Sequence, residues 1–213
     1  MKIIIFGAGG HGRVVLDILR KNGEFELAGF LDSNSELHGK EVDGLPVLGD
    51  KAVLPELASK SVEGAVIAIG DNRDRAEIAA VVRESGLRLV NAVHPAATVA
   101  GNAQVGEGVV LAAGSIICAH ARIGDNTIIN TGAIIEYECV IKENVNIGPG
   151  VKIAGWTTVD SGTFIGIGAT LIACLKIGRD SIISAGSIVT KDIPDNVTVV
   201  GVHGKIIRES RPS

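Results

Sequence analysis

The first residues with an arrangement suited to chemistry form a glycine-rich loop near the start of the chain. Gly7, Gly9 and Gly12 follow a short apolar run over 2–6 and precede a helical pattern over 13–21. Backbone amides in such a loop can approach a pyrophosphate, and the N-terminus of the following helix favours its negative charge. The spacing therefore predicts a nucleotide-binding loop. In the alternative interpretation the glycines serve only a tight turn, and His11 merely starts the helix.

Asp32 is the second polar residue of interest in this region. It follows the apolar run 27–31, the second expected strand, where an acidic residue can accept hydrogen bonds from a ribose or a base. A further strand over 64–69 and a helix over 72–85 complete the alternation. Residues 1–90 therefore predict an α/β, Rossmann-like βαβ domain with a mostly parallel sheet. It is shorter than a complete NAD domain and lacks a second nucleotide half, so an NAD enzyme is not expected.

The rest of the chain follows a six-residue period. Seventeen consecutive positions spaced six apart, from Val93 to Val189, are all Val, Ile or Leu. A period of six is typical of a parallel β-helix, in which three faces make a coil of eighteen residues. Positions eighteen apart then stack at about the 4.8 Å spacing of neighbouring strands. We expect residues 91–213 to form this all-β domain and a C-terminal tail.

The turns of the predicted coils fall into three stacks, one at each corner of the column. The glycine corner has glycine in every coil: Gly114, Gly132, Gly150, Gly168 and Gly186. The asparagine corner has residues that tolerate the left-handed backbone region, namely Gly108, Asn126, Asn144, Gly162 and Asp180. The irregular corner breaks this pattern with Asn102, His120, Glu138, Trp156, Cys174 and Asp192.

The irregular corner is where we expect chemistry, because local departures from a regular scaffold are often functional. His120 precedes Glu138 by one coil of eighteen residues, which predicts a stacked His–carboxylate pair. The alternative is a corner that simply faces solvent and varies without function.

Composition excludes several classes of function. The formal net charge is −4 and there is no run rich in Lys or Arg, which argues against a nucleic-acid partner. No apolar stretch approaches eighteen residues, so no membrane span is expected, and the segment 1–6 is too short for a signal peptide. The three cysteines, Cys118, Cys139 and Cys174, lack metal-ligand spacing. Free thiols in a cytoplasmic protein without a metal site are expected.

Together these features resemble the hexapeptide-repeat acyltransferases with a left-handed β-helix. The specific likeness is to nucleotide-amino-sugar N-acetyltransferases and the sialic acid O-acetyltransferase group. It covers the whole chain and is carried by the stretches 6–12, 68–72, 130–136 and 200–202. The resemblance implies a homotrimer that binds acetyl-CoA along the cleft between adjacent columns. It also implies a nucleotide sugar on the N-terminal domain, lined by Gly9, Gly10, His11, Asp32, Ser33 and Gly70.

The acyl-transfer site departs from the family pattern. Family members have Ile-Glu-His followed by an acidic residue, with the histidine as base, whereas this chain has Tyr137 between Glu136 and Glu138. A second family histidine, which contacts the thioester, corresponds to Asn146. Tyrosine is a poor base near neutral pH, and loss of a general base typically costs about 10²–10⁴-fold in rate. The resemblance implies thioester contacts from Asn146, Gly155, Ile167 and Ala185.

Three outcomes follow from this departure. A neutral sugar amine can attack a thioester without prior deprotonation, so an N-acetyltransferase needs a base less than an O-acetyltransferase does. Alternatively, a displaced base acts, with His120 a better candidate than His203. The third outcome is a catalytically silent nucleotide-sugar-binding trimer.

We therefore expect a cytoplasmic, acetyl-CoA-dependent N-acetyltransferase acting on a nucleotide-linked amino sugar in bacterial surface-glycan biosynthesis. The alternatives are a sialic-acid-type O-acetyltransferase and the silent trimer. The residues expected near the acceptor amine are Asn130, Glu138, Tyr137 and His120.

Overall fold

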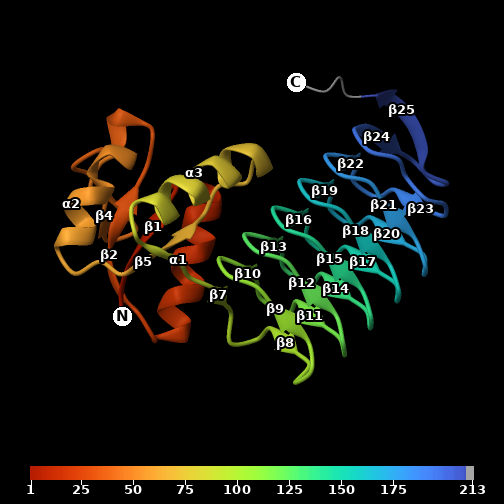
Figure 1. Cartoon of the computed structure of the whole chain (residues 1–213), viewed down its shortest axis with the longest axis horizontal. Coiled ribbons are helices and arrows are strands. Elements are labelled where there is room, and N and C mark those ends of the chain that lie inside the picture. Colours follow the sequence, from red (N-terminus) through yellow and green to blue (C-terminus); the bar gives the residue numbers. More distant parts are fainter. Residues whose placement is uncertain (210–213) are drawn as a thin grey trace. The chain divides into compact units, whose positions relative to one another are not determined.

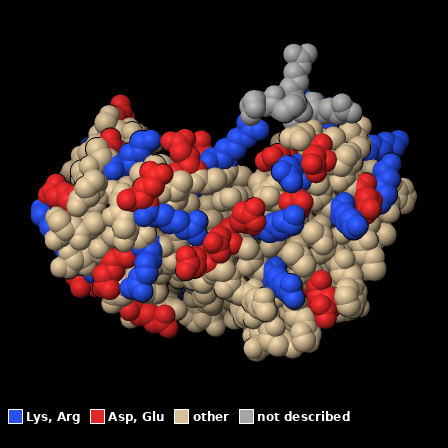
Figure 2. Space-filling model, viewed as in Figure 1, with Lys and Arg blue, Asp and Glu red and all other residues tan. Residues whose placement is uncertain are grey.

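The computed structural model describes residues 1–209 and divides into two compact units (Figure 1). The N-terminal unit is Met1–Pro95, and the β-helix unit begins at Ala96. Within the described residues no helix is both long enough and apolar enough to cross a membrane. Lys and Arg side chains are interspersed with Asp and Glu side chains on the face drawn in Figure 2.

The N-terminal unit is a parallel sheet with helices, as predicted. Its sheet has the strand order β2-β1-β5-β6 and is parallel throughout. The elements are β1 (Lys2–Phe6), α1 (Gly10–Asn22), β2 (Glu26–Leu31), β3 (Glu41–Val42), β4 (Leu45–Pro46), α2 (Leu54–Ser59), β5 (Gly64–Ile67), α3 (Asn72–Glu84), β6 (Arg88–Leu89) and β7 (Ala92–Val93). Two 3-10 turns, Ser35–Leu37 and Lys51–Val53, lie between them.

Local sequence explains where the two long helices begin and end. Helix α1 ends at Gly23, whose φ of 73° and N–H bond to the Leu19 carbonyl form a left-handed C-cap. Helix α3 begins after Asp71, whose side chain accepts hydrogen bonds from the N–H groups of Arg73 and Asp74. Central strand β1 is buried on both faces, as expected for a parallel sheet covered by helices.

The β-helix unit consists of two-residue strands that stack in parallel at a register of eighteen residues, as in the series Ile129, Ile147 and Ile165. One face continues into the tail and contains β10 (Val110–Leu111), β13 (Ile128–Ile129), β16 (Asn146–Ile147), β19 (Phe164–Ile165), β22 (Ile182–Ile183), β24 (Val197–Val200) and β25 (Lys205–Glu209). The second contains β8 (Thr98–Val99), β11 (Ile116–Ile117), β14 (Ile134–Ile135), β17 (Lys152–Ile153), β20 (Thr170–Leu171) and β23 (Ile188–Val189). The third contains β9 (Gln104–Val105), β12 (Arg122–Ile123), β15 (Val140–Ile141), β18 (Thr158–Val159) and β21 (Lys176–Ile177).

The core of this unit is the column of aliphatic residues that defined the period. From Leu111 to Val189 every residue of that six-residue series is buried. Val99 is 38% exposed because β8 is the terminal strand of its sheet. The parallel β-helix predicted from the period is thus confirmed.

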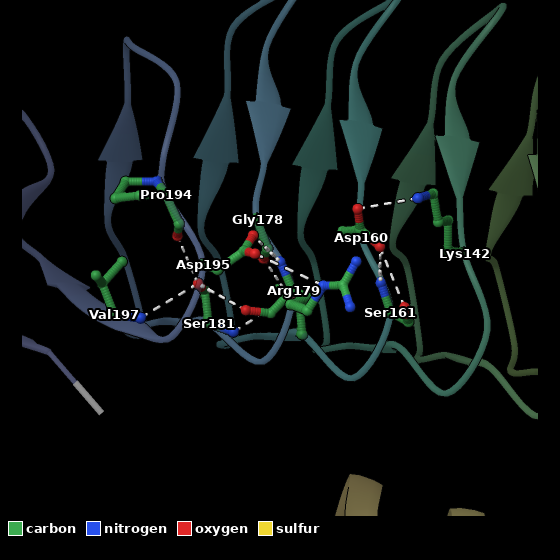
Figure 3. Close-up of polar contacts among 10 residues, drawn as sticks. Lys142, Asp160, Ser161, Gly178, Arg179, Ser181, Pro194, Asp195 and Val197 are labelled. Carbon is green, nitrogen blue, oxygen red and sulfur yellow. Dashed lines mark hydrogen bonds and ion pairs between the residues drawn. The ribbon is translucent and has the colours of Figure 1, made fainter. Parts of the chain in front are cut away.

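The tail closes the last coil through side chains that replace missing strand pairs (Figure 3). Asp195 Oδ1 accepts the N–H of Arg179 at 2.9 Å. Ser181 Oγ donates to the Pro194 carbonyl at 2.9 Å and accepts the N–H of Val197 at 3.3 Å. Polar side chains therefore satisfy backbone groups that would otherwise be left unpaired at the end of the column.

Candidate functional site

The glycines of the first loop differ in what surrounds them. Gly7 has a φ of 106°, and a Cβ there would lie 2.6 Å from the Ala68 carbonyl oxygen. A Cβ on Gly12 would collide with the backbone of Gly7. In contrast, a Cβ on Gly9 or Gly10 would meet no atom within 4 Å, and neither residue has a positive φ. Packing therefore explains Gly7 and Gly12, and leaves the two exposed glycines open to the close approach of a ligand.

Helix α1 begins inside this loop, three residues earlier than the sequence predicted. Its N-cap is Gly9, which provides no side-chain cap, and its first turn has no acidic residue. The first amides of a helix lack intrahelical partners and carry partial positive charge, which favours an anion at this end.

Asp32 holds the loop in place. Its Oδ2 accepts the N–H of Ala8 at 2.8 Å, and its Oδ1 accepts the N–H of Asn34 at 2.8 Å. Its carbonyl oxygen lies 2.8 Å from His38 Nε2. Each carboxylate oxygen keeps lone pairs for further donors, so Asp32 can hold the loop and still accept a hydrogen bond from a ligand. Its contact with a ribose or base stays a prediction.

A cavity of about 350 Å³ lies where β1, β2 and β5 end. In open parallel sheets ligands bind at these carboxyl ends, at the point where successive connections leave in opposite directions. Here β2 lies on one side of β1 and β5 on the other. The cavity is lined by Phe6, Gly7, Asp32, Ser33, Asp50, Lys51, Ile69, Asp74, Glu77 and Ile78.

Of the residues predicted to bind nucleotide, Asp32 and Ser33 line this cavity. The cavity lining does not include the other predicted residues, Gly9, Gly10, His11 and Gly70. It does include Gly7, and Gly9 and Gly10 follow closely after Gly7 in the chain. Sequence reasoning missed Asp50, Lys51, Asp74 and Glu77. Asp74 and Glu77 lie three residues apart on α3 and therefore share a face of that helix. This spacing was the feature of the sequence that could have identified them.

The second loop of this unit is held by Arg75, whose side chain is fully buried. Its Nη1 donates to the carbonyls of Ile69, Gly70 and Asp71, and its Nη2 donates to Asn72 Oδ1 at 2.7 Å. Burial lowers the pKa of Arg75 to about 10, an effect that the nearby Asp71 opposes. The guanidinium therefore stays charged and fixes the loop after β5. Sequence reasoning missed this residue.

His11 is neutral in the folded protein. Burial, and secondarily the charge of Arg75, lower the pKa of His11 to about 4. Its Nε2 is buried and has no hydrogen-bond partner in the described part of the chain.

The residues predicted for acyl transfer lie in the β-helix unit, at two of its corners. Tyr137, Glu138, His120 and Gly155 belong to the irregular corner, which follows β14 and its stacked neighbours. Asn130, Ile167 and Ala185 belong to the glycine corner, and Asn146 lies on β16, on the face that leads into that corner. The structure thus brings them together in two groups, at opposite edges of the face that contains β14.

In the described part of the chain, no hydrogen bond or ion pair joins His120 to Glu138 at the irregular corner, so this predicted pair is wrong. His120 contacts Asn102 instead: Asn102 Oδ1 accepts its backbone N–H at 3.2 Å, and Asn102 Nδ2 lies 3.1 Å from its Nε2. Because Oδ1 is committed to the backbone N–H, the amide NH₂ must face the ring. Nε2 therefore accepts, and the proton of the neutral ring lies on Nδ1.

The irregular corner is strained as well as irregular. The left-handed φ values here are 60° for His120, 59° for Glu138, 63° for Trp156 and 65° for Cys174. Non-glycine residues in this region typically pay about 1–2 kcal/mol, and such strain often marks a functional place.

Tyr137 and Trp156 form an exposed aromatic pair at this corner. They are 49% and 57% exposed, and their rings meet edge-on with centroids 6.3 Å apart. A Cβ on Gly155 would lie 2.8 Å from Cζ of Tyr137. The Tyr137 ring therefore covers Gly155, for which the family resemblance implies a contact with the thioester.

The other group centres on an amide pair. Asn130 Nδ2 donates to Asn146 Oδ1 at 3.2 Å and to the Ile147 carbonyl at 3.1 Å. Asn146 is buried, and Ile167 is 58% exposed. The backbone N–H of Ala185 lies so close to Gly166 that a Cβ there would approach it to 2.6 Å.

Two cysteine thiols near the irregular corner are poor nucleophiles. Burial, reinforced by the charge and hydrogen bond of Glu136, raises the pKa of Cys118. Burial also raises the pKa of Cys139 to about 11. Since the thiolate is the reactive form, neither thiol is activated. No group of three or more His, Cys, Asp or Glu residues suited to a metal ion occurs in the part of the chain that the structure describes.

Comparison with known proteins identifies the family. Residues 2–82 match the PglD N-terminal domain, and residues 120–155 match the bacterial transferase hexapeptide repeat. A solved His-to-Ala mutant of GDP-perosamine N-acetyltransferase from Caulobacter crescentus, in complex with CoA and GDP-perosamine, is 39% identical. The match covers 98% of both chains with a TM-score of 0.94. This chain belongs to the hexapeptide-repeat N-acetyltransferases.

Other members of the family give the same picture. The acetyltransferase domain of PglB from Neisseria gonorrhoeae FA1090, in complex with acetyl coenzyme A, is 33% identical. That match covers 97% of this chain and 98% of that one, with a TM-score of 0.91. UDP-N-acetylbacillosamine N-acetyltransferase of Bacillus subtilis (strain 168) is 35% identical over 52% of this chain and 51% of its own length. Further curated relatives match over only 16% to 22% of their length.

Proposed function

We propose that this hexapeptide-repeat protein transfers an acetyl group from acetyl-CoA to the amine of a nucleotide-linked amino sugar in surface-glycan biosynthesis. The observation that carries the proposal is the match over 98% of both chains to an N-acetyltransferase that binds CoA and GDP-perosamine. It includes both the nucleotide-loop unit and the β-helix. The open surface at Gly9 and Gly10 and the adjacent cavity support nucleotide binding by the N-terminal unit.

The reaction would proceed by direct attack of a neutral amine. The amine nitrogen bonds to the thioester carbon, the carbon–sulfur bond breaks, and CoA leaves as a thiolate that takes up the proton lost by the nitrogen. Backbone and amide N–H groups near the carbonyl would stabilise the developing oxyanion. We assign Asn146 and the close-packed turn at Ala185 to the donor side. Asn130, expected from the sequence near the acceptor amine, is assigned to the donor side as well because it bonds to Asn146.

The acceptor side would be the irregular corner. We assign Glu138 and Tyr137 to contacts with the amine, and His120 to the same corner with its Nδ1–H as a donor. Tyr137 is better suited to orient the amine than to remove its proton, because tyrosine is a poor base near neutral pH. An amine acceptor therefore suits this chain better than the sugar hydroxyl that an O-acetyltransferase would use.

The two-corner distribution supports a homotrimer as the active form. Tyr137, Glu138 and His120 lie at one edge of the column, and Asn130, Asn146 and Ala185 lie at another, so one column alone does not unite the two groups. Gly155, which the resemblance implied as a thioester contact, lies with the acceptor group. When columns pack side by side around a three-fold axis, one edge of each column lies beside a different edge of the next. The site would then form between chains. The cytoplasmic location stays a prediction.

One observation favours a second candidate, a trimer that binds nucleotide sugar without catalysis. Tyr137 replaces the family base, and its ring covers Gly155, where the thioester was expected. If the ring does not move aside on binding, acetyl-CoA cannot occupy that place.

An acetylation assay distinguishes the two candidates. Purified protein is mixed with acetyl-CoA and a panel of UDP-, dTDP- and GDP-linked amino sugars, and release of the CoA thiol is followed. We expect thiol release with at least one amino sugar and none with the corresponding hydroxyl sugar. Nucleotide-sugar binding without thiol release would favour the silent trimer, and absence of both would overturn both candidates.

A further inference from the structure

The walls of the cavity in the N-terminal unit suit a flat aromatic ring. Phe6, Ile69 and Ile78 provide apolar surface from β1, the loop after β5, and α3. A volume of about 350 Å³ lies at the lower end of the range for small-molecule sites, about 300–1,000 Å³. It is compatible with a nucleoside and too small for a complete dinucleotide.

Four of the six polar side chains of the lining are carboxylates, which only accept hydrogen bonds when ionised, and Ser33 adds a hydroxyl. Asp50, Asp74 and Glu77 provide carboxylates, and Lys51 provides one ammonium, which lies 3.2 Å from Glu77 Oε1. Asp50 Oδ1 accepts the N–H of Ala52 at 2.8 Å, which caps the turn and fixes that side chain. With Asp32, four carboxylates face one cation in this cavity.

This charge pattern separates the parts of a nucleotide. Four carboxylates repel a pyrophosphate, so the cavity is not the phosphate site. The uncapped N-terminus of α1 is the favourable place for phosphate, and Gly9 is two residues from Gly7, which lines the cavity. Two residues span at most about 7 Å of extended chain. A nucleotide with phosphate at Gly9–Gly10 would therefore place its nucleoside in the cavity.

We propose that this cavity selects guanine over the other nucleobases, so that the substrates are guanosine-diphosphate-linked amino sugars. The inference rests on the function proposed above. Guanine presents two adjacent N–H donors, N1–H and N2–H, beside the O6 acceptor. A carboxylate of the lining accepts both donors in a bidentate pair, and the Lys51 ammonium donates to O6.

The other bases match this lining poorly. Uracil and thymine have a single N3–H between two carbonyl oxygens, so a carboxylate that accepts this proton is repelled on both sides. Cytosine and adenine each present an amino group beside a ring-nitrogen acceptor, and therefore lack the second adjacent donor. Discrimination by one bidentate pair is typically worth about 10-fold to 100-fold in affinity.

Binding of free nucleotides to the full-length protein tests this proposal. Dissociation constants of GDP, UDP and dTDP are measured by calorimetry at one salt concentration, for the wild type and for Asp74→Asn, Glu77→Gln and the double variant. We expect the wild type to bind GDP about 10-fold or more tightly than UDP or dTDP. The double variant should reduce this preference to within about threefold, while its affinity for UDP changes little.

Glu84→Gln is the matched control, because Glu84 lies on the same helix but does not line the cavity. It should keep the preference of the wild type. The proposal is overturned if UDP or dTDP binds as tightly as GDP, or if the double variant keeps the wild-type ratio. If UDP or dTDP binds as tightly as GDP and a UDP- or dTDP-linked sugar is acetylated, only the guanine preference is overturned. If no nucleotide binds and no sugar is acetylated, the proposed function fails as well.

Discussion

Each glycine of the first loop has its own physical reason to be glycine, and substitution separates these reasons. Gly12→Ala should destabilise the N-terminal unit by at least about 2 kcal/mol, because its Cβ would collide with backbone that cannot move aside. Gly9→Ala and Gly10→Ala should change stability by less than about 0.5 kcal/mol, because their Cβ atoms meet open space. These two variants should nevertheless weaken GDP binding by about tenfold, if phosphate contacts the backbone there.

Circular dichroism and calorimetry check this prediction. Helices α1, α2 and α3 all belong to the N-terminal unit among the described residues, so the helical signal reports its unfolding. Nucleotide affinity unchanged in both Gly9→Ala and Gly10→Ala would show that phosphate does not contact the backbone at these glycines.

His11 gives the N-terminal unit a defined pH dependence. The pKa of its imidazole is lowered from 6.5 to about 4 on folding, so between these values the unfolded chain binds a proton that the folded chain does not. Stability from this residue is complete above about pH 6.5 and is lost as the pH falls towards 4. At pH 5 the loss is about 2 kcal/mol relative to pH 8.

Urea unfolding at pH 8 and pH 5, followed by circular dichroism, measures this effect in the wild type and in His11→Gln. Other groups titrate equally in both proteins, so the difference between their pH dependences isolates His11. Identical pH dependences would mean that the ring is more hydrated in the folded protein than its burial indicates.

At the scale of elements, the irregular corner repeats one strained turn with unsuitable residues. Cys174 has a φ of 65° and an exposed side chain. Asn tolerates this backbone region better than Cys does, so Cys174→Asn should stabilise the β-helix unit by about 0.5–1 kcal/mol. Cys174→Ala removes the same thiol but keeps the strain, and should leave stability unchanged.

Fluorescence of Trp156 reports unfolding of this unit, since it is the single tryptophan of the chain. Denaturant midpoints of the two variants are compared with the wild type. Equal stabilisation by Asn and Ala would attribute the gain to loss of the thiol rather than to relief of backbone strain.

At this scale the sequence predicted the periodic features of the fold and did not predict some of the others. The coils could be predicted because a buried aliphatic residue recurs at every sixth position from Leu111 to Val189. The β3–β4 hairpin was missed, although Asp43 and Gly44, with φ values of 48° and 75°, are a typical two-residue turn between apolar residues. The cavity lining was also missed. Lys51 and Glu77 come from separate segments, and only tertiary packing brings them together.

The His120–Glu138 prediction failed for a different reason. Stacking at eighteen residues correctly placed the two residues in neighbouring coils, but it did not say which neighbour each side chain would choose. His120 bonds to the coil before it, where Asn102 satisfies its backbone N–H and faces its ring at once. An amide that can donate and accept competes effectively with a carboxylate that can only accept.

At the scale of the whole molecule, the separation of the candidate site into two corners predicts complementation between chains. One variant carries His120→Asn, Tyr137→Ala and Glu138→Asn, with Asn chosen at the two left-handed positions to preserve the backbone. A second variant carries Asn130→Ala and Asn146→Ala at the donor side. In the proposed homotrimer, each variant alone should be inactive in thiol release, because every site lacks one of its halves.

Mixed trimers should regain activity if the site forms between chains. In a ring of three, a site is intact when the chain providing the irregular corner is the Asn130/Asn146 variant and its neighbour is the corner variant. Random assembly from equal amounts makes about one quarter of the sites intact, because each of the two choices has even odds. Co-refolding the two variants should therefore restore about a quarter of wild-type activity, whereas mixing folded trimers without exchange should restore none. Far-UV circular dichroism establishes that both variants fold, and sedimentation establishes their assembly state. Inactivity of co-refolded, correctly assembled mixtures would mean that both corners of one column act in the same site, and would contradict the assembly argued from their separation.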